Sequence, residues 1–112
     1  MIEKTGLLNQ RVMIVLRRFH PQTPREIIRG IITEVDEFGV RVSGRRFREM
    51  TDHDAPVPFE RPVETETKVY WIPFNSIRYS EIILAGSVSE RADVEIQSRK
   101  PVTALELRQT SV

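Results

Sequence analysis

The side chains best suited to ligand chemistry in this sequence lie at two short turns. Phe38 follows an acidic pair, and an exposed ring at such a turn can stack on a nucleic-acid base. Asn75 lies in a Pro-Phe-Asn-Ser segment, where its amide can hydrogen-bond the edge of a base. Two plainer roles stay open: Phe38 would then cover the end of a hydrophobic core, and Asn75 would serve as a turn former.

An arginine-rich segment follows the first turn. Its guanidinium groups could line a path for phosphates, because arginine presents a planar fork of donors to an anion. The alternative is a solvated hairpin tip, since two aspartates come soon after the arginines. The net charge of the chain is only +1, but residues 1–50 carry a balance of +4 and residues 51–112 a balance of −3. The arginines concerned are Arg41, Arg45, Arg46 and Arg48.

Metal-binding and catalytic patterns are missing from the sequence. His20 and His53 stand alone, without the spacing of metal ligands, and the chain has no cysteine. It has neither a glycine-rich phosphate loop nor a nucleophile elbow. Asp36 and Glu37 are adjacent, so on a strand their carboxylates would point apart. We therefore expect no metal, no cofactor and no catalytic activity.

The composition is that of one small soluble domain. The chain has 112 residues, of which 39% are hydrophobic and 29% are charged. No apolar run approaches the roughly 20 residues that a membrane-spanning helix needs, and the N-terminus lacks a secretory apolar core. These features favour a cytoplasmic protein without a membrane partner.

Short β-strands account for most of the apolar pattern. Residues 11–18 alternate with period two and are rich in β-branched side chains, which is typical of a strand. Residues 25–36 form a second, longer strand, in which Gly30 marks a sharp bend or bulge. After a turn at residues 37–39, a third strand begins with residues 40–43 and completes a tight hairpin.

The remaining segments are shorter or more polar. The stretch 44–68 is polar with three prolines and reads either as an extended hairpin tip or as a loose loop. Strands follow at residues 69–72 and 77–84, with a short turn between them. Polar residues 86–112 predict a mostly disordered tail, and residues 5–10 a helical turn. The predicted fold is all-β: a five-stranded, strongly bent antiparallel barrel within residues 1–85.

Two parts of this pattern resemble the Sm-like family, which includes the bacterial Hfq proteins. Apolar residues over 12–16, followed by Gly30, Asp36 and Phe38 in a run of alternating apolar positions, resemble its first motif. The segment from Ile72 to Ile77, with Ile82 beyond it, resembles its second motif. Leu7-Leu8-Asn9 before the first strand is similar to the N-terminal helix of the family.

The resemblance implies a non-catalytic, RNA-binding homo-oligomeric ring. In such rings the last two strands of one subunit pair with those of its neighbours. An oligomeric scaffold or protein-interaction module on the same fold, without RNA activity, is the alternative. The chain departs from the family at Phe74-Asn75, where Hfq proteins carry Lys-His, and in the length of 44–68. The residues expected to contact RNA are Asp36, Phe38, Phe74, Asn75, Arg41, Arg45 and Arg46.

Overall fold

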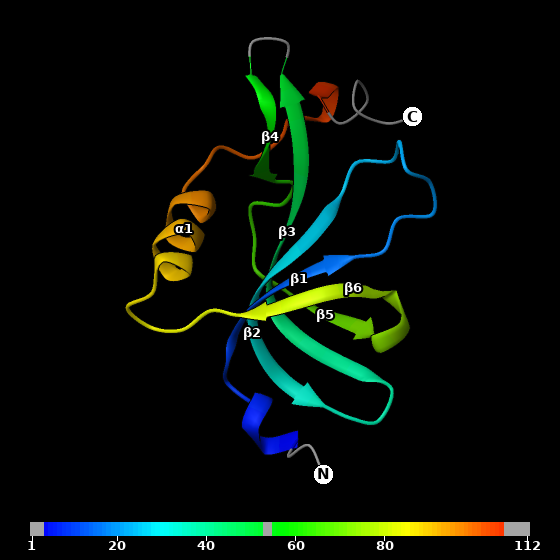
Figure 1. Cartoon of the computed structure of the whole chain (residues 1–112), viewed down its shortest axis with the longest axis vertical. Coiled ribbons are helices and arrows are strands. Elements are labelled where there is room, and N and C mark those ends of the chain that lie inside the picture. Colours follow the sequence, from blue (N-terminus) through cyan, green and yellow to red (C-terminus); the bar gives the residue numbers. More distant parts are fainter. Residues whose placement is uncertain (1–3, 53–54, 107–112) are drawn as a thin grey trace.

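The fold is a single antiparallel sheet of six strands with one helix against it (Figure 1). The computed structural model describes residues 4–52 and 55–106. The elements are η1 (Lys4–Leu7), β1 (Arg11–Leu16), β2 (Glu26–Val35), β3 (Gly39–Asp52), β4 (Ala55–Pro62), β5 (Lys68–Pro73), η2 (Phe74–Ser76), β6 (Ile77–Ile82) and α1 (Val88–Gln97).

The sheet has the order β4-β3-β2-β1-β6, and β5 pairs with β3 beside β4. β3 is long enough to hold both: residues 39–44 pair with β5 and residues 47–52 with β4. The all-β class is therefore confirmed. The strand count of five is wrong, because β4 adds a sixth, and the sheet is not closed: within the described residues no register joins β5 to β6.

The stretch 44–68 is largely a hairpin and not a loose loop. β3 continues to Asp52, and β4 returns along it. The polar composition hides this because few side chains of the hairpin are buried: Phe47 is 0% exposed, Met50 is 6% exposed, and Pro62 is also buried. The prolines of β4 are tolerated because an edge strand needs N–H donors on one side only.

The expected disordered tail contains a packed helix. α1 begins after Ser87, whose side chain accepts a hydrogen bond from the backbone N–H of Glu90 as an N-cap. Ile96 and Asp93 are buried against the sheet, while the other helical residues stay at the surface. Because only these two residues of α1 are buried, the composition of the helix is polar, and the sequence therefore predicted disorder here.

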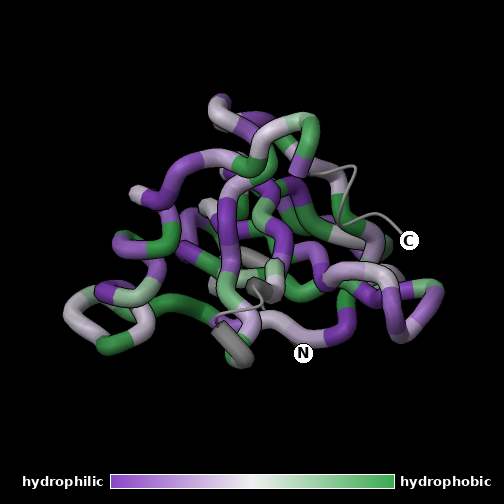
Figure 2. The backbone as a smooth tube through the Cα atoms, turned by 90° about the horizontal axis from the view of Figure 1, so that it is seen from above, coloured by the Kyte–Doolittle hydropathy of each residue, from purple (hydrophilic) through white to green (hydrophobic). Residues whose placement is uncertain are grey.

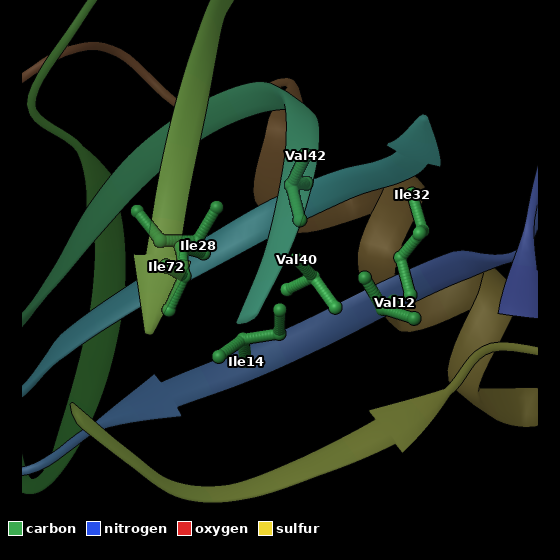
Figure 3. Packing of buried hydrophobic residues seen from close by; sticks show 7 residues of the cluster. All are labelled: Val12, Ile14, Ile28, Ile32, Val40, Val42 and Ile72. Atoms are coloured by element: carbon green, nitrogen blue, oxygen red, sulfur yellow. The ribbon is translucent and has the colours of Figure 1, made fainter. Parts of the chain in front are cut away.

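Buried side chains form a cluster on each face of the sheet. On the concave face the cluster draws on β1, β2, β3 and β5, as Figure 3 shows. On the opposite face Val15, Ile27 and Phe47 pack with Ile96 of α1. Figure 2 shows hydrophobic and hydrophilic residues alternating along much of the backbone, as strands with two distinct faces require. The concave cluster comprises Val12, Ile14, Ile28, Ile32, Val40, Val42 and Ile72.

Gly30 lies where the backbone of β3 leaves no room for a side chain on β2. It is directly opposite Gly44 in the register, and a Cβ built on Gly30 would be 2.2 Å from the carbonyl oxygen of Ser43. Both strands change direction along their length (Figure 1), and the register shift between them lies at Ile32 and Glu34, not at Gly30. The need for glycine is steric, since Gly30 is not among the residues with positive φ.

Candidate functional site

Three segments far apart in the sequence meet at one end of the sheet. The backbone N–H of Phe74 in η2 donates to the carbonyl oxygen of Phe38 at 2.9 Å. On its other side η2 accepts a bond from the β1–β2 loop, since the N–H of Arg17 donates to the carbonyl oxygen of Ser76 at 2.9 Å. The β2–β3 turn, η2 and the β1–β2 loop therefore lie side by side (Figure 1).

Asp36 shapes the β2–β3 turn. Its carboxylate Oδ1 accepts hydrogen bonds from the backbone N–H groups of Phe38, at 2.7 Å, and of Gly39, at 3.0 Å. Its part in any binding site is therefore to hold the turn that presents Phe38.

Phe38, Phe74 and Asn75 are brought to the same end of the sheet by the hydrogen bond between η2 and the β2–β3 turn. The Phe38 side chain is 70% exposed, so it does not cover the core, whereas Phe74 is 43% exposed and also lines an apolar cavity. Asn75 is exposed, and its side chain makes no hydrogen bond to any residue that the structure describes. The three residues form an exposed cluster with two aromatic rings and one free amide.

The arginines of β3 are not gathered in the same place. Arg41 pairs with Glu34 at 3.4 Å, and Arg46 pairs with Glu64 at 3.7 Å. Arg45 donates to the backbone carbonyl of Gln97 in α1. Because β3 continues as a strand, neighbouring arginines point to opposite faces of the sheet. These side chains contact groups of the protein itself and lie on both faces of the sheet.

Glu64 joins Arg46 to a second polar group. The hydroxyl of Tyr70 donates to the Glu64 carboxylate, and Lys68 lies 3.5 Å from it. Burial alone would raise the pKa of Glu64, but the Tyr70 bond and the charges of Lys68 and Arg46 outweigh it and lower that pKa. Burial and the same bond raise the pKa of the Tyr70 hydroxyl. The single charge of Glu64 is therefore shared between Arg46 and Lys68 and offsets each of them only in part.

A buried ionic network attaches α1 to the sheet, and the sequence did not reveal it. Asp93 is 0% exposed and pairs with Arg29 at 2.9 Å and with Arg11 at 3.3 Å. Arg29 also donates two bonds to Glu60 of β4, at 3.0 and 2.8 Å. Burial would lower the pKa of Arg29, but Glu60 and Asp93 together raise it. The one signal in the sequence was an arginine inside an apolar strand, which requires a buried partner.

Three strands lie at edges of the open sheet, β4, β5 and β6, and two of them, β5 and β6, have free backbone groups on their outer sides. The Ile83 N–H donates to the Arg11 carbonyl at 2.8 Å, and hydrogen-bonded pairs alternate along an antiparallel ladder. The backbone N–H groups of Ser80 and Ile82 therefore point away from β1. Just after β5, the N–H of Phe74 donates to the carbonyl of Phe38. The same alternation along the strand therefore directs the backbone N–H groups of Val69 and Trp71 away from β3.

Apolar surface accompanies both edges. Val69 is 67% exposed and Trp71 is 47% exposed on β5, while Tyr79 and Ile82 of β6 are also exposed. Between β6 and the concave core lies an apolar cavity of about 500 Å³, with Ile82, Ser80 and Phe74 among its lining residues. Each edge thus combines free backbone groups with side chains that a second strand could cover.

The described residues contain no cluster of histidine and acidic side chains suited to a metal ion. No helix in the same residues has the length and apolar character to span a membrane. Comparisons with protein-family models, with curated proteins and with solved structures find no match for this chain.

Proposed function

We propose that this protein is a non-catalytic module that assembles with copies of itself by pairing β5 of one chain with β6 of the next. The observation that carries the proposal is the pair of edges with outward backbone groups and exposed apolar side chains. Exposed strand edges attract further strands unless they are covered or blocked. Pairing would satisfy these groups and cover Val69, Trp71 and Ile82.

The third edge strand, β4, is blocked, and this supports the pairing of β5 with β6. Pro62 occupies an outward position, and Pro56 and Pro58 remove two further N–H donors from the strand. The outward carbonyl of Pro62 already accepts from the N–H of Val102 at 2.8 Å. Blocked by proline and covered by its own chain, β4 cannot take part in the same pairing.

Pairing of two different edges leads to a ring or a filament. A head-to-tail interface repeats from chain to chain, and it closes into a ring when the rotation between neighbours divides a full turn. Three features support the Sm-like arrangement that the sequence suggested. They are the strand order β5-β3-β2-β1-β6, the close backbone contact at Gly30 and the one-turn link η2 between the last two strands. We therefore propose a closed homo-oligomeric ring.

Proline at an outward position of β6 tests the edge pairing. Ser80→Pro removes an N–H that does not bond to β1, so the fold is expected to survive while the assembly dissociates. Light scattering should then report the 13.0 kDa of a single chain, with the far-UV circular dichroism of the parent. Ser80→Ala keeps the N–H and is expected to keep the parent mass.

A charge on either edge gives an independent check. Ile82→Glu and Trp71→Lys each place a charge in the proposed interface and should also dissociate the assembly. Ile83 is buried, so a charge there would disrupt the core and test nothing about assembly. An unchanged mass in Ser80→Pro and in both charge variants would place the contact between chains elsewhere.

RNA binding is a second candidate function, and the exposed cluster of Phe38, Phe74 and Asn75 favours it. Base stacking on an aromatic ring contributes roughly 1–3 kcal/mol per base. Phe38→Ala is therefore expected to weaken binding of poly-U or poly-A by about 5- to 150-fold in filter-binding titrations. If the parent protein binds neither homopolymer at low salt, this candidate function is wrong.

A further inference from the structure

The β1–β2 loop forms a basic groove that the sequence motifs did not point to. The groove encloses about 600 Å³ and is lined by Arg17, Arg18, Phe19, Pro21 and, from β6, Arg78. Three of these five residues carry a positive charge, and no acidic residue lines the groove. The groove therefore presents concentrated positive charge.

The arginines of the groove differ from those of β3 in their partners. Arg17 donates to the backbone carbonyl of Ile77, and Arg18 to two carbonyls of its own loop. The guanidinium group of Arg78 makes no hydrogen bond or ion pair within residues 4–52 and 55–106. In the same ranges, none of the three pairs with a carboxylate. Their charges therefore face an anionic ligand without a competing carboxylate, whereas Arg41 and Arg46 each have an acidic partner.

Phe19 is fully exposed and lines the groove together with the three arginines. The loop holds it there through its own bonds: the N–H of Thr23 donates to the carbonyl of His20 at 3.0 Å, and Arg18 binds the carbonyl of Pro21 at 3.1 Å. A single exposed apolar residue is ordinary by itself. An aromatic ring beside unpaired arginines is the combination that binds single-stranded nucleic acid, because bases stack on the ring and phosphates meet the guanidinium groups.

We propose that this groove binds the backbone of a single-stranded nucleic acid, with Arg17, Arg18 and Arg78 on phosphates and Phe19 stacked on a base. The inference rests on the RNA-binding function proposed above as the second candidate. The hydrogen bond from Arg17 to η2 connects the groove to the cluster of Phe38 and Phe74, so one strand can run across both. A lipid surface fits less well, because Phe19 is the only large apolar side chain that lines the groove.

The test uses the full chain and fluorescent oligonucleotides of about 12 nucleotides, within the roughly 4–16 nucleotides that a small single-strand-binding domain covers. Anisotropy titrations with oligo-U, oligo-A and oligo-dT are run at about 50 mM and about 200 mM salt. The variants are Phe19→Ala and the double variant Arg18→Gln with Arg78→Gln. Arg91→Gln is the matched control, because Arg91 is an exposed arginine on α1, outside the groove.

Phe19→Ala is expected to weaken binding by about 5- to 150-fold. The double arginine variant should lower the slope of log affinity against log salt by about 1.4, since each phosphate contact to a single strand contributes about 0.7. Arg91→Gln should leave both quantities unchanged. Because all these side chains are exposed, thermal unfolding of the variants should match that of the parent.

Other results overturn the inference in distinguishable ways. Binding that falls in Phe38→Ala but not in the groove variants would reject the groove and leave the proposed RNA function standing. Absence of binding by the parent to every oligonucleotide would reject both. Sedimentation with phosphatidylserine vesicles that depends on Phe19 and the groove arginines, without oligonucleotide binding, would assign the groove to a lipid surface. Equal effects in Arg91→Gln would mean that only the overall charge matters.

Discussion

Replacing Gly30 by valine is expected to lower the free energy of unfolding by at least about 3 kcal/mol. A Cβ at this position would be 2.2 Å from the Ser43 carbonyl oxygen and 2.7 Å from the Cα of Gly44. These neighbours are backbone atoms of the paired strand, so relief requires β2 and β3 to separate. Thermal unfolding followed by circular dichroism should show a midpoint lower by roughly 10 °C or more.

Gly6→Val is the control for this variant. A Cβ on Gly6 would meet nothing within 4 Å, so the same substitution there should leave the midpoint nearly unchanged. The chains must be compared at equal concentration, because assembly raises the apparent stability of whatever assembles. A Gly30→Val protein that unfolds with the parent would show that β2 and β3 do not approach each other in this way.

The second large effect is expected from Asp93→Asn. The substitution keeps the size of the side chain but removes the charge that faces Arg29 and Arg11 inside the protein. The loss is expected to be about 1.5–3 kcal/mol, the range for hydrogen bonds to charged groups, because Arg29 loses the Asp93 charge but keeps its two bonds to Glu60. Urea unfolding of the variant should show a loss of this size.

Glu95→Gln on the same helix separates this effect from a general loss of helix charge. Glu95 is exposed and pairs with Arg99 one turn further along, an arrangement that contributes about 0.3–0.5 kcal/mol. Equal stabilities of the Asp93 and Glu95 variants would contradict the assignment of the buried network as the attachment of α1.

The strands with simple alternation were predictable from the sequence. Residues 11–18, 25–36, 69–72 and 77–84 were expected as strands, and the structure has strands at Arg11–Leu16, Glu26–Val35, Lys68–Pro73 and Ile77–Ile82. Their apolar residues recur with period two and are rich in valine and isoleucine, so local preference and packing agree. The helical turn at the N-terminus was also found, as η1.

The outer layer of the fold was not predictable from local pattern. α1 and β4 depend on contacts between distant residues, such as Asp93 with Arg29 and Phe59 opposite Met50. Few of their positions are apolar, so composition indicated a tail and left a loop possible. A buried ion pair leaves no periodic signal, because each partner taken alone looks like a surface residue.

The candidate site was predictable only in part. Asp36, Phe38, Phe74 and Asn75 were each expected to contact RNA from their places in the two motifs, and the structure brings the two turns that carry them together. The β3 arginines were grouped by closeness in sequence, but a strand sends alternate side chains to opposite faces. The arginines without carboxylate partners come instead from the β1–β2 loop and β6, which meet only in the folded chain.

The mass of the unmodified chain in solution tests the proposed edge-to-edge assembly most directly. Light scattering after size exclusion, at micromolar concentration, should report a discrete mass several times that of the 13.0 kDa chain. A discrete multiple is expected because head-to-tail pairing of β5 with β6 leaves no free edge once the ring closes. A mass of 13.0 kDa at every concentration would contradict the assembly, and the exposed edges of β5 and β6 would then need another partner.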